Sequence, residues 1–232
     1  MYKRQATNRS LMGIIAAALM LLLSQLTMSG MSSYVYPNYY GSAAAQSLAS
    51  LVGMAGTLLI CAPTAVKLSQ KFGKKELATA GAIVGAVSYL LCFFLRPANP
   101  FVYVAFAAVA TVSMGYFNTV VWAMITDVID DTEVRTGVRE DGTVYSVYSF
   151  ARKLGQAISS GLIGGLLTMI GYSEATAFDP AVTGKIFNLA CLAPFAGFVA
   201  LALILMFLYP LNKTRVEQNI ATLAARREGK EN

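Results

Sequence analysis

Six long apolar stretches restrict what this chain can fold into more than any other feature of its sequence. A helix needs about 20 mostly apolar residues to cross a bilayer, because each residue adds about 1.5 Å and the hydrocarbon core is about 30 Å thick. Lipid offers no partner to a free backbone N–H or C=O, so each stretch must be helical. The stretches cover residues 11–31, 44–66, 77–95, 101–125, 142–170 and 186–208. The sequence therefore predicts an all-α membrane protein with six transmembrane helices in one bundle.

The composition and the chain ends agree with this organisation. Hydrophobic residues make up 56% of the 232 residues and charged residues only 13%, against about 25% charged in soluble domains. We expect residues 1–10 to be a cytoplasmic segment, residues 11–210 to form the bundle, and residues 211–232 to be a cytoplasmic tail. In the tail, Val216, Ile220 and Leu223 repeat on one helical face, which predicts a short amphipathic helix.

The basic residues indicate the orientation, because they are kept out of short translocated loops. On one side of the predicted bundle lie Lys3, Arg4, Arg9, Lys67, Lys71, Lys74, Lys75, Arg135, Arg139, Lys213, Arg215, Arg226, Arg227 and Lys230. The opposite side has only Arg96 and Lys185. Both chain ends are therefore predicted to be cytoplasmic, in a multi-pass protein of the inner or plasma membrane. The net charge of +6 is then a consequence of topology, with lipid as the partner and no nucleic acid.

Several chemistries lack their sequence signals. The chain contains no histidine, no glycine-rich phosphate loop and no nucleophile elbow, which disfavours ATP-driven and hydrolytic mechanisms. Its three cysteines stand in three separate apolar stretches, so we expect no disulfide, metal site or cofactor. A membrane enzyme that uses carboxylates remains an alternative, as does a structural subunit.

Lys153 is a charge inside an apolar stretch. It lies eleven residues after the start of stretch 142–170, about 16 Å along the axis and near the bilayer midplane. A lysine at that depth costs about 2.5–3.5 kcal/mol in lipid, so it should face a cavity or a partner. The helical face of Lys153 also carries Tyr145, Ser149 and Gln156, and Arg152 lies at the edge of that face. Either cation could point inward, and an ion pair that only joins two helices is the structural alternative.

A second polar face is predicted on the fourth stretch. Asn118 and Trp122 are four residues apart, and Asn118 precedes Asp127 by nine residues, which places the amide about 13 Å deep. An amide and an indole near the midplane suit a sugar, which offers hydroxyls to bond and C–H faces to stack. Packing alone is the alternative for Trp122.

Charged residues crowd the connection between the fourth and fifth stretches. They are Asp127, Asp130, Asp131, Glu133, Arg135, Arg139, Glu140 and Asp141. In a transporter such a set could close a cytoplasmic gate by ion pairs that break on opening, with Asp127, Asp130, Arg139 and Asp141 as the candidate gate residues. A solvated loop surface is the alternative, and we prefer it for Arg135 and Glu140.

Four tyrosines mark the first predicted extracellular connection. Tyr34, Tyr36, Tyr39 and Tyr40 lie within seven residues without a charge among them. Amphipathic rings are typical of a membrane interface. The functional alternative is an outer vestibule in which the rings stack on a pyranose.

Five motifs together resemble the glycoside–pentoside–hexuronide:cation symporters of the major facilitator superfamily. They are Asp127-x-x-Asp130-x-x-Glu133, Thr136-Gly137-x-Arg139, Gly142-x-x-Tyr145-Ser146, Phe150-x-x-Lys153-x-Gly155 and Gly171-Tyr172. The likeness covers nearly the whole chain and is greatest to the glucuronide-carrier branch. It implies a fold of twelve helices in two bundles, of which this chain is the C-terminal half.

The resemblance also implies roles for individual residues. It assigns Lys153 to the central cavity, and Asp127, Asp130 and Arg139 to the cytoplasmic gate. Asp131 stands where the family usually has tyrosine, and Asp141 where it usually has glutamate. The acidic residues that bind the coupling Na⁺ or H⁺ would lie in the N-terminal bundle.

The implied function is symport of a glycoside or hexuronide with a cation, by alternating access. We expect the chain to be inactive without the N-terminal bundle, unless two copies pair in parallel as a half-transporter dimer. The opening residues 1–5 match nothing in the family and suggest a truncated start.

Overall fold

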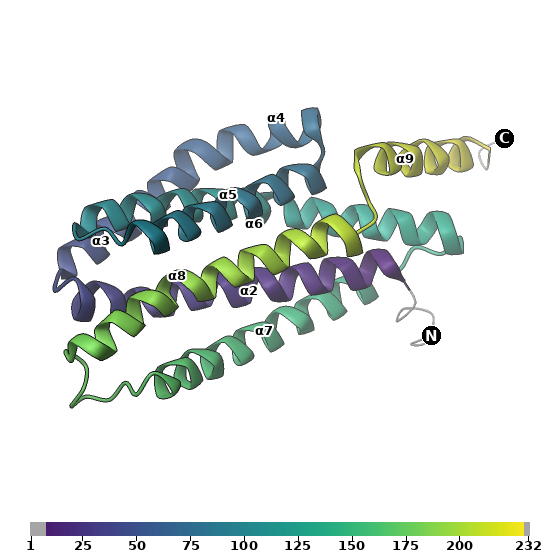
Figure 1. The fold of residues 1–232 in the computed structure, drawn as a ribbon. Helices are drawn as coiled ribbons and strands as arrows, with labels where there is room; N and C mark the ends of the chain where they lie inside the picture. The colour runs from purple at the N-terminus through teal and green to yellow at the C-terminus, as the bar shows by residue number, and fades with distance from the viewer. Residues whose placement is uncertain (1–7, 230–232) are drawn as a thin grey trace.

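The computed structural model describes residues 8–229, which are helical with no strand (Figure 1). Six long helical rods and one shorter helix follow one another along the chain. Short π-helical turns, labelled η, interrupt one rod and end two others. The elements are α2 (Arg9–Tyr34) with η1 (Val35–Tyr39); α3 (Ala43–Gly56), η2 (Thr57–Cys61) and α4 (Ala62–Phe72); α5 (Lys74–Leu95); α6 (Pro100–Thr136); α7 (Asp141–Met169); α8 (Pro180–Leu203) with η3 (Ile204–Leu208); and α9 (Lys213–Glu228).

Five of the rods are long and apolar enough to cross a membrane. They are Arg9–Tyr39, Ala43–Phe72, Lys74–Leu95, Pro100–Thr136 and Pro180–Leu208. The predicted all-α membrane class is therefore confirmed. Helix α7 has 29 residues, ample length for a bilayer of about 30 Å, but it is not one of the five. Its membrane crossing, and with it the count of six, stays a prediction.

The prediction that Asp127, Asp130 and Asp131 lie in a loop is wrong. Helix α6 continues to Thr136 and includes all three. Hydropathy locates the end of an apolar stretch, whereas a helix satisfies its own backbone groups and can continue into water. The helix ends at Gly137, whose φ of 74° is the left-handed conformation that glycine adopts without strain.

Side-chain caps define two other helix starts. Asn8 accepts hydrogen bonds from the backbone N–H groups of Ser10 and Leu11 at the start of α2. Asp179 does the same for Ala181, with Pro180 at the first helical position of α8. Such caps satisfy N–H groups that have no partner inside the helix, and α8 accordingly begins six residues before its predicted stretch.

The rods pack side by side. Helix α5 packs on α6 and α8, α2 packs on α8 and α7, and α3 packs on α6, while α6 makes smaller contacts with α2 and α7. Glycines allow the close approaches between the rods. A Cβ atom at Gly81 would lie 2.6 Å from the backbone oxygen of Ser113 on α6, and one at Gly85 would lie 2.7 Å from the Phe198 ring on α8. At Gly161, on α7, a Cβ atom would meet nothing within 4 Å.

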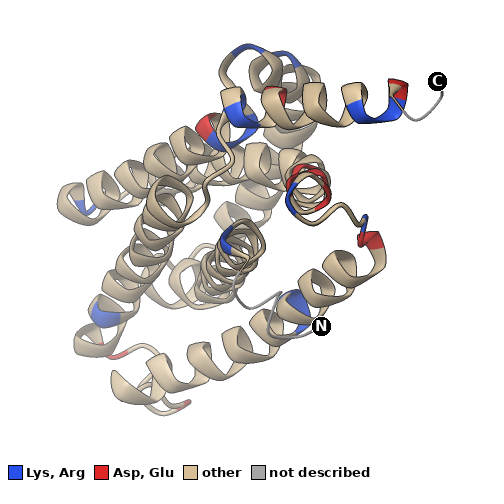
Figure 2. Ribbon diagram, turned by 90° about the vertical axis from the view of Figure 1, so that its right-hand side faces the viewer, with Lys and Arg blue, Asp and Glu red and all other residues tan. Residues whose placement is uncertain are grey.

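Charge gathers at the end of the bundle that holds both chain ends. Figure 2 looks onto this end and shows charged segments on α9 and on the near ends of the rods. Arg96 and Lys185 lie at the far end of α5 and near the start of α8. Lys3, Arg4 and Lys230, which are also predicted on the basic side of the bundle, lie outside the described residues. So does most of the predicted segment 1–10.

Helix α9 occupies the tail segment in which a short amphipathic helix is predicted, and it packs against the C-terminal part of α6 (Figure 1). Leu223 is buried, whereas Ile220 is 54% exposed. The tail helix therefore rests on the bundle with only part of its apolar face covered.

Candidate functional site

The predicted polar stripe lies on a face of α7 that the described residues leave uncovered. Tyr145, Ser149, Lys153 and Gln156 are all exposed. The neighbouring face of α7, with Gly155, is buried, and a Cβ atom at Gly155 would come within 3.5 Å of α2 side chains. Within residues 8–229, Lys153 has no carboxylate partner. The structure thus gives no support to a helix-joining ion pair for this lysine.

An aromatic and cationic cluster joins α6 to α7 beside this stripe. The Trp122 ring stacks on Tyr145, with centroids 6.4 Å apart, and meets Tyr148 edge-on at 5.6 Å. The Arg152 guanidinium lies 5.6 Å from the Trp122 centroid and 5.9 Å from that of Tyr148, within range of a cation–π attraction. Trp122 remains 48% exposed, so one part of its ring is free for a ligand. Of the two cations, Arg152 turns toward α6 and Lys153 faces outward.

Asn118 lies one helical turn before Trp122 on α6 and is half-buried. The hydrogen bonds of the described chain give its amide no partner, although the neighbouring Thr119 hydroxyl donates to the Gly115 carbonyl. An amide that lacks a protein partner can bind a hydroxylated ligand or water.

Arg139 organises one group of the candidate gate residues, which we call the Arg139 cluster. Its Nη1 atom lies 2.9 Å from Asp130 Oδ1 and 2.9 Å from Glu133 Oε2, and its Nε atom lies 2.9 Å from Asp141 Oδ2. Donating to Asp130 and Glu133 raises the pKa of Arg139 above its ordinary value, because hydrogen bonds to carboxylates favour the charged guanidinium. The cluster links the end of α6 to the start of α7.

Asp127 does not belong to the Arg139 cluster. It lies on the side of α6 that faces α5, and its Oδ1 atom is 2.6 Å from Lys74 Nζ. Asp127 is only 5% exposed. The four predicted gate residues therefore divide into two ion-pair groups, because Asp127 pairs with Lys74 whereas Asp130 and Asp141 pair with Arg139.

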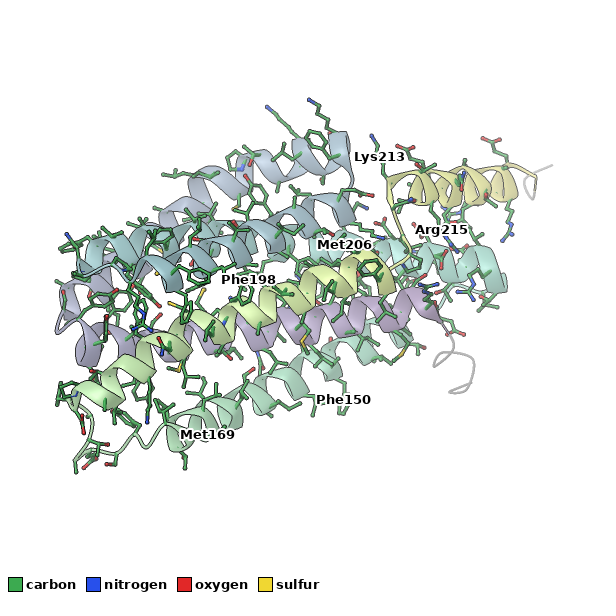
Figure 3. The ribbon with its side chains drawn as sticks, viewed as in Figure 1. Phe150, Met169, Phe198, Met206, Lys213 and Arg215 are labelled. Carbon is green, nitrogen blue, oxygen red and sulfur yellow. The ribbon has the colours of Figure 1, made fainter. Side chains whose placement is uncertain are left out.

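Asp131 forms a third junction that the sequence did not reveal. It is 1% exposed and accepts hydrogen bonds from Ser10 Oγ at 2.7 Å, Arg215 Nη2 at 3.3 Å and Asn219 Nδ2 at 3.2 Å. These donors come from α2 and α9. Arg215 reaches from α9 toward the bundle in Figure 3. The only sequence signal for this junction was a set of polar residues on the predicted tail helix. That pattern does not predict that they bind Asp131.

Comparison with known proteins places these features in a family. Residues 1–213 match the family described as MFS/sugar transport protein. The chain is 30% identical over 223 residues to a glucuronide carrier protein homolog of Escherichia coli K12, which covers 95% of this chain and 48% of that protein. It is 36% identical over 160 residues to a putative sulfoquinovose importer of the same organism, covering 69% of this chain and 33% of that protein.

A third relative is similar to this chain over a shorter segment. A putative glycoside/cation symporter of Escherichia coli K12, YagG, is 37% identical over 105 residues, covering 44% of this chain and 23% of that protein. This chain thus spans about half of the first relative's length and less of the other two. These relatives are named as carriers, importers and symporters rather than enzymes. With a family match over most of its length, the chain belongs to the MFS/sugar transport protein family of multi-pass membrane proteins.

Proposed function

We propose that this chain is one six-helix bundle of a sugar:cation symporter that works by alternating access. The observation that carries the proposal is the uncovered face of α6 and α7, where Trp122, Arg152 and Lys153 lie together in a chain of the sugar-transport family. Helix α7 is then the sixth membrane helix. Its lysine would be costly against lipid, so a second bundle must cover this face.

The chemistry of the face favours an anionic sugar. The half-exposed Trp122 ring offers a surface for the C–H face of a pyranose, and Asn118 offers an amide for its hydroxyls. Lys153 and Arg152 add positive charge that pairs with a carboxylate or sulfonate. A glucuronide and sulfoquinovose, which appear in the names of two relatives, both carry such a group.

The missing wall of the site would come from the N-terminal bundle of a longer protein, or from a second copy of this chain. By itself the bundle has no partner to rock against, and we expect it to be inactive. Carboxylates that bind the driving Na⁺ or H⁺ would belong to the other bundle.

The charged end of the bundle would lie in the cytoplasm with both chain ends, as expected for a cell inner-membrane protein. There the Arg139 cluster and the Lys74–Asp127 pair are positioned to act as inner-gate contacts. The site would open or close when these ion pairs break and the same residues contact the second bundle instead.

The test is uptake by a chimera in which this chain replaces the C-terminal half of the E. coli glucuronide carrier protein homolog. Cells that express the chimera should accumulate radiolabelled methyl glucuronide. Uptake by cells that express this chain alone would instead indicate that a second copy supplies the missing wall. Lys153→Ala should lower uptake at least about tenfold, because a charge-assisted hydrogen bond is lost. Lys185→Ala removes an exposed lysine near the opposite end and is the matched control. A chimera that inserts normally but carries no sugar would refute the proposal.

A further inference from the structure

Two lysines near the end of α4 differ from the other basic residues at the end of the bundle that holds both chain ends. Lys67 and Lys71 are exposed, and within residues 8–229 neither ammonium group has an oxygen partner. The other described basic residues of this end each contact a carboxylate, amide or backbone carbonyl oxygen; they are Arg9, Lys74, Lys75, Arg135, Arg139, Lys213, Arg215, Arg226 and Arg227. The lysine pair of α4 is therefore free to bind an anion from outside the chain.

Both lysines lie on the uncovered face of α4. Pro63, Lys67 and Lys71 follow at intervals of four residues, which places them on one side of the helix, and all three are exposed. Helix α4 packs on α5 and α6, and its buried residue, Ala65, lies on a different side. The exposed surface that precedes the lysines along the same rod is apolar, and it is formed by Leu58, Leu59, Ile60 and Val66, which are between 48% and 75% exposed.

The length of the rod places this change from apolar to basic at the edge of a bilayer. The rod Ala43–Phe72 has 30 residues, which is about 45 Å at about 1.5 Å per residue, whereas the hydrocarbon core is about 30 Å thick. A rod centred in the membrane therefore has about five residues at each end in the headgroup layer. Lys71 lies within that layer. Lys67 lies at its inner edge, from where the long side chain reaches the headgroups.

A cleft between α4, α5 and α9 adjoins the lysine pair. Its volume is about 240 Å³, and Gln70 and Lys213 are among the residues that line it. Gln70 is exposed, and its amide has no hydrogen-bond partner in the described part of the chain. Lys213 joins the two helices by donating to the Lys71 carbonyl at 3.1 Å, and Figure 3 shows Lys213 at the start of α9 beside the end of α4. The cleft thus adds a free amide to the lysine pair.

The carboxylates that line the cleft are engaged by other lysines. Asp127 Oδ1 lies 2.6 Å from Lys74 Nζ, and Glu217 Oε1 lies 3.9 Å from Lys213 Nζ. Neither carboxylate forms an ion pair with the lysines of α4. The positive charge at the end of α4 is therefore not neutralised by the described chain.

We propose that the Lys67–Lys71 pair binds the phosphodiester of an anionic phospholipid, with an acyl chain along the apolar surface of the same rod. Two ammonium groups one helical turn apart can both donate to one phosphate, and Gln70 can bond a headgroup hydroxyl. Phosphatidylglycerol supplies both groups, whereas a choline headgroup brings a positive charge that the lysines repel. The Phe72 ring is 53% exposed and 5.1 Å from Lys71 Nζ, so it extends the apolar surface to the headgroup. Lipid binding here does not depend on the proposed sugar site.

Native mass spectrometry of the purified chain tests the proposal. The chain is titrated with dioleoyl phosphatidylglycerol or dioleoyl phosphatidylcholine, and the fraction that carries one lipid gives the affinity for each. Phosphatidylglycerol should bind at least about tenfold more tightly, because each lysine near an anionic headgroup contributes about fivefold. Equal affinities for the two lipids would overturn the proposal.

Variants of the two lysines locate the site. Lys67→Ala/Lys71→Ala should weaken phosphatidylglycerol binding about tenfold or more and leave phosphatidylcholine binding unchanged, and Lys67→Arg/Lys71→Arg should keep both affinities. The fold should be retained, because both side chains are exposed and neither has an oxygen partner in residues 8–229. Lys185→Ala/Arg227→Ala, which removes two charges from exposed side chains elsewhere, is the matched control. An equal loss in this control would assign the attraction to net charge and overturn the site.

Two further measurements separate a lipid from other occupants. Inorganic phosphate in large excess should not displace phosphatidylglycerol, because free phosphate has no acyl chain; displacement would assign a free anion and overturn the proposal. Phosphatidylglycerol with a photoreactive acyl chain should label residues 57–72 both in this chain and in the chimera with an N-terminal bundle. Labelling that is lost in the chimera would show that the second bundle covers this surface, which would also overturn the proposal.

Discussion

Removal of the Asp131 carboxylate should loosen the end of the bundle that holds both chain ends. The carboxylate is 1% exposed and binds donors from α2 and α9. Ser10 and Asn219 are themselves buried, and each would lose a bond to a charged acceptor, worth about 1.5–3 kcal/mol. Arg215 is 46% exposed, so its pairing adds less than about 1 kcal/mol. We therefore expect Asp131→Ala to lower the free energy of unfolding by about 3–6 kcal/mol.

Thermal unfolding in detergent and hydrogen exchange together measure this effect. The midpoint should fall, and amides of residues 213–228 should exchange faster because α9 loses its anchor. Glu217→Ala is the matched control, since its pairing with Lys213 spans 3.9 Å between side chains that are 63% and 40% exposed; a loss below about 1 kcal/mol is expected. Equal losses for Asp131→Ala and Glu217→Ala, with α9 exchange unchanged, would refute the reasoning.

Three further outcomes follow from the packing and the charges. Lys74→Ala should destabilise the chain by about 3 kcal/mol, because it leaves Asp127 buried without its cation; adding Asp127→Asn should restore much of the loss in the same unfolding assay, and no restoration would argue against the pair. Gly81→Ala should cost about 1–3 kcal/mol through overpacking on the α6 backbone, whereas Gly161→Ala should cost nothing measurable; equal thermal midpoints for both would contradict the close approach. Methyl glucuronide should quench or shift the emission of Trp122, and Lys153→Ala should raise the half-saturating concentration about tenfold or more; an unshifted titration would remove Lys153 from the site.

The helices were predictable because their cause is local. Five of the six apolar stretches appear as long apolar helices, since a run of apolar residues in lipid has no alternative to internal hydrogen bonding. The boundaries were less predictable. Helix α6 extends past its apolar stretch to Thr136, because a helix ends where its caps and backbone torsions end it and not where it meets water.

Parts of the candidate site could also be placed from the sequence. The spacing of Tyr145, Ser149 and Lys153 is enough to put them on one face of α7, because helical periodicity is fixed. The pairing of Trp122 with Tyr145 and Arg152 across two helices depended on how α6 and α7 lie against each other. Periodicity carries no information about that arrangement.

The sequence by itself determined that this chain is a helical membrane protein with a charge in an apolar helix, because both properties are set by residue chemistry and spacing along one segment. Only the tertiary structure decided which charges meet. Asp127 pairs with Lys74 on α5, Asp130 with Arg139, and Asp131 with donors on α2 and α9. These partners are between 9 and 121 residues apart in the chain, and helix packing brings them within hydrogen-bond distance.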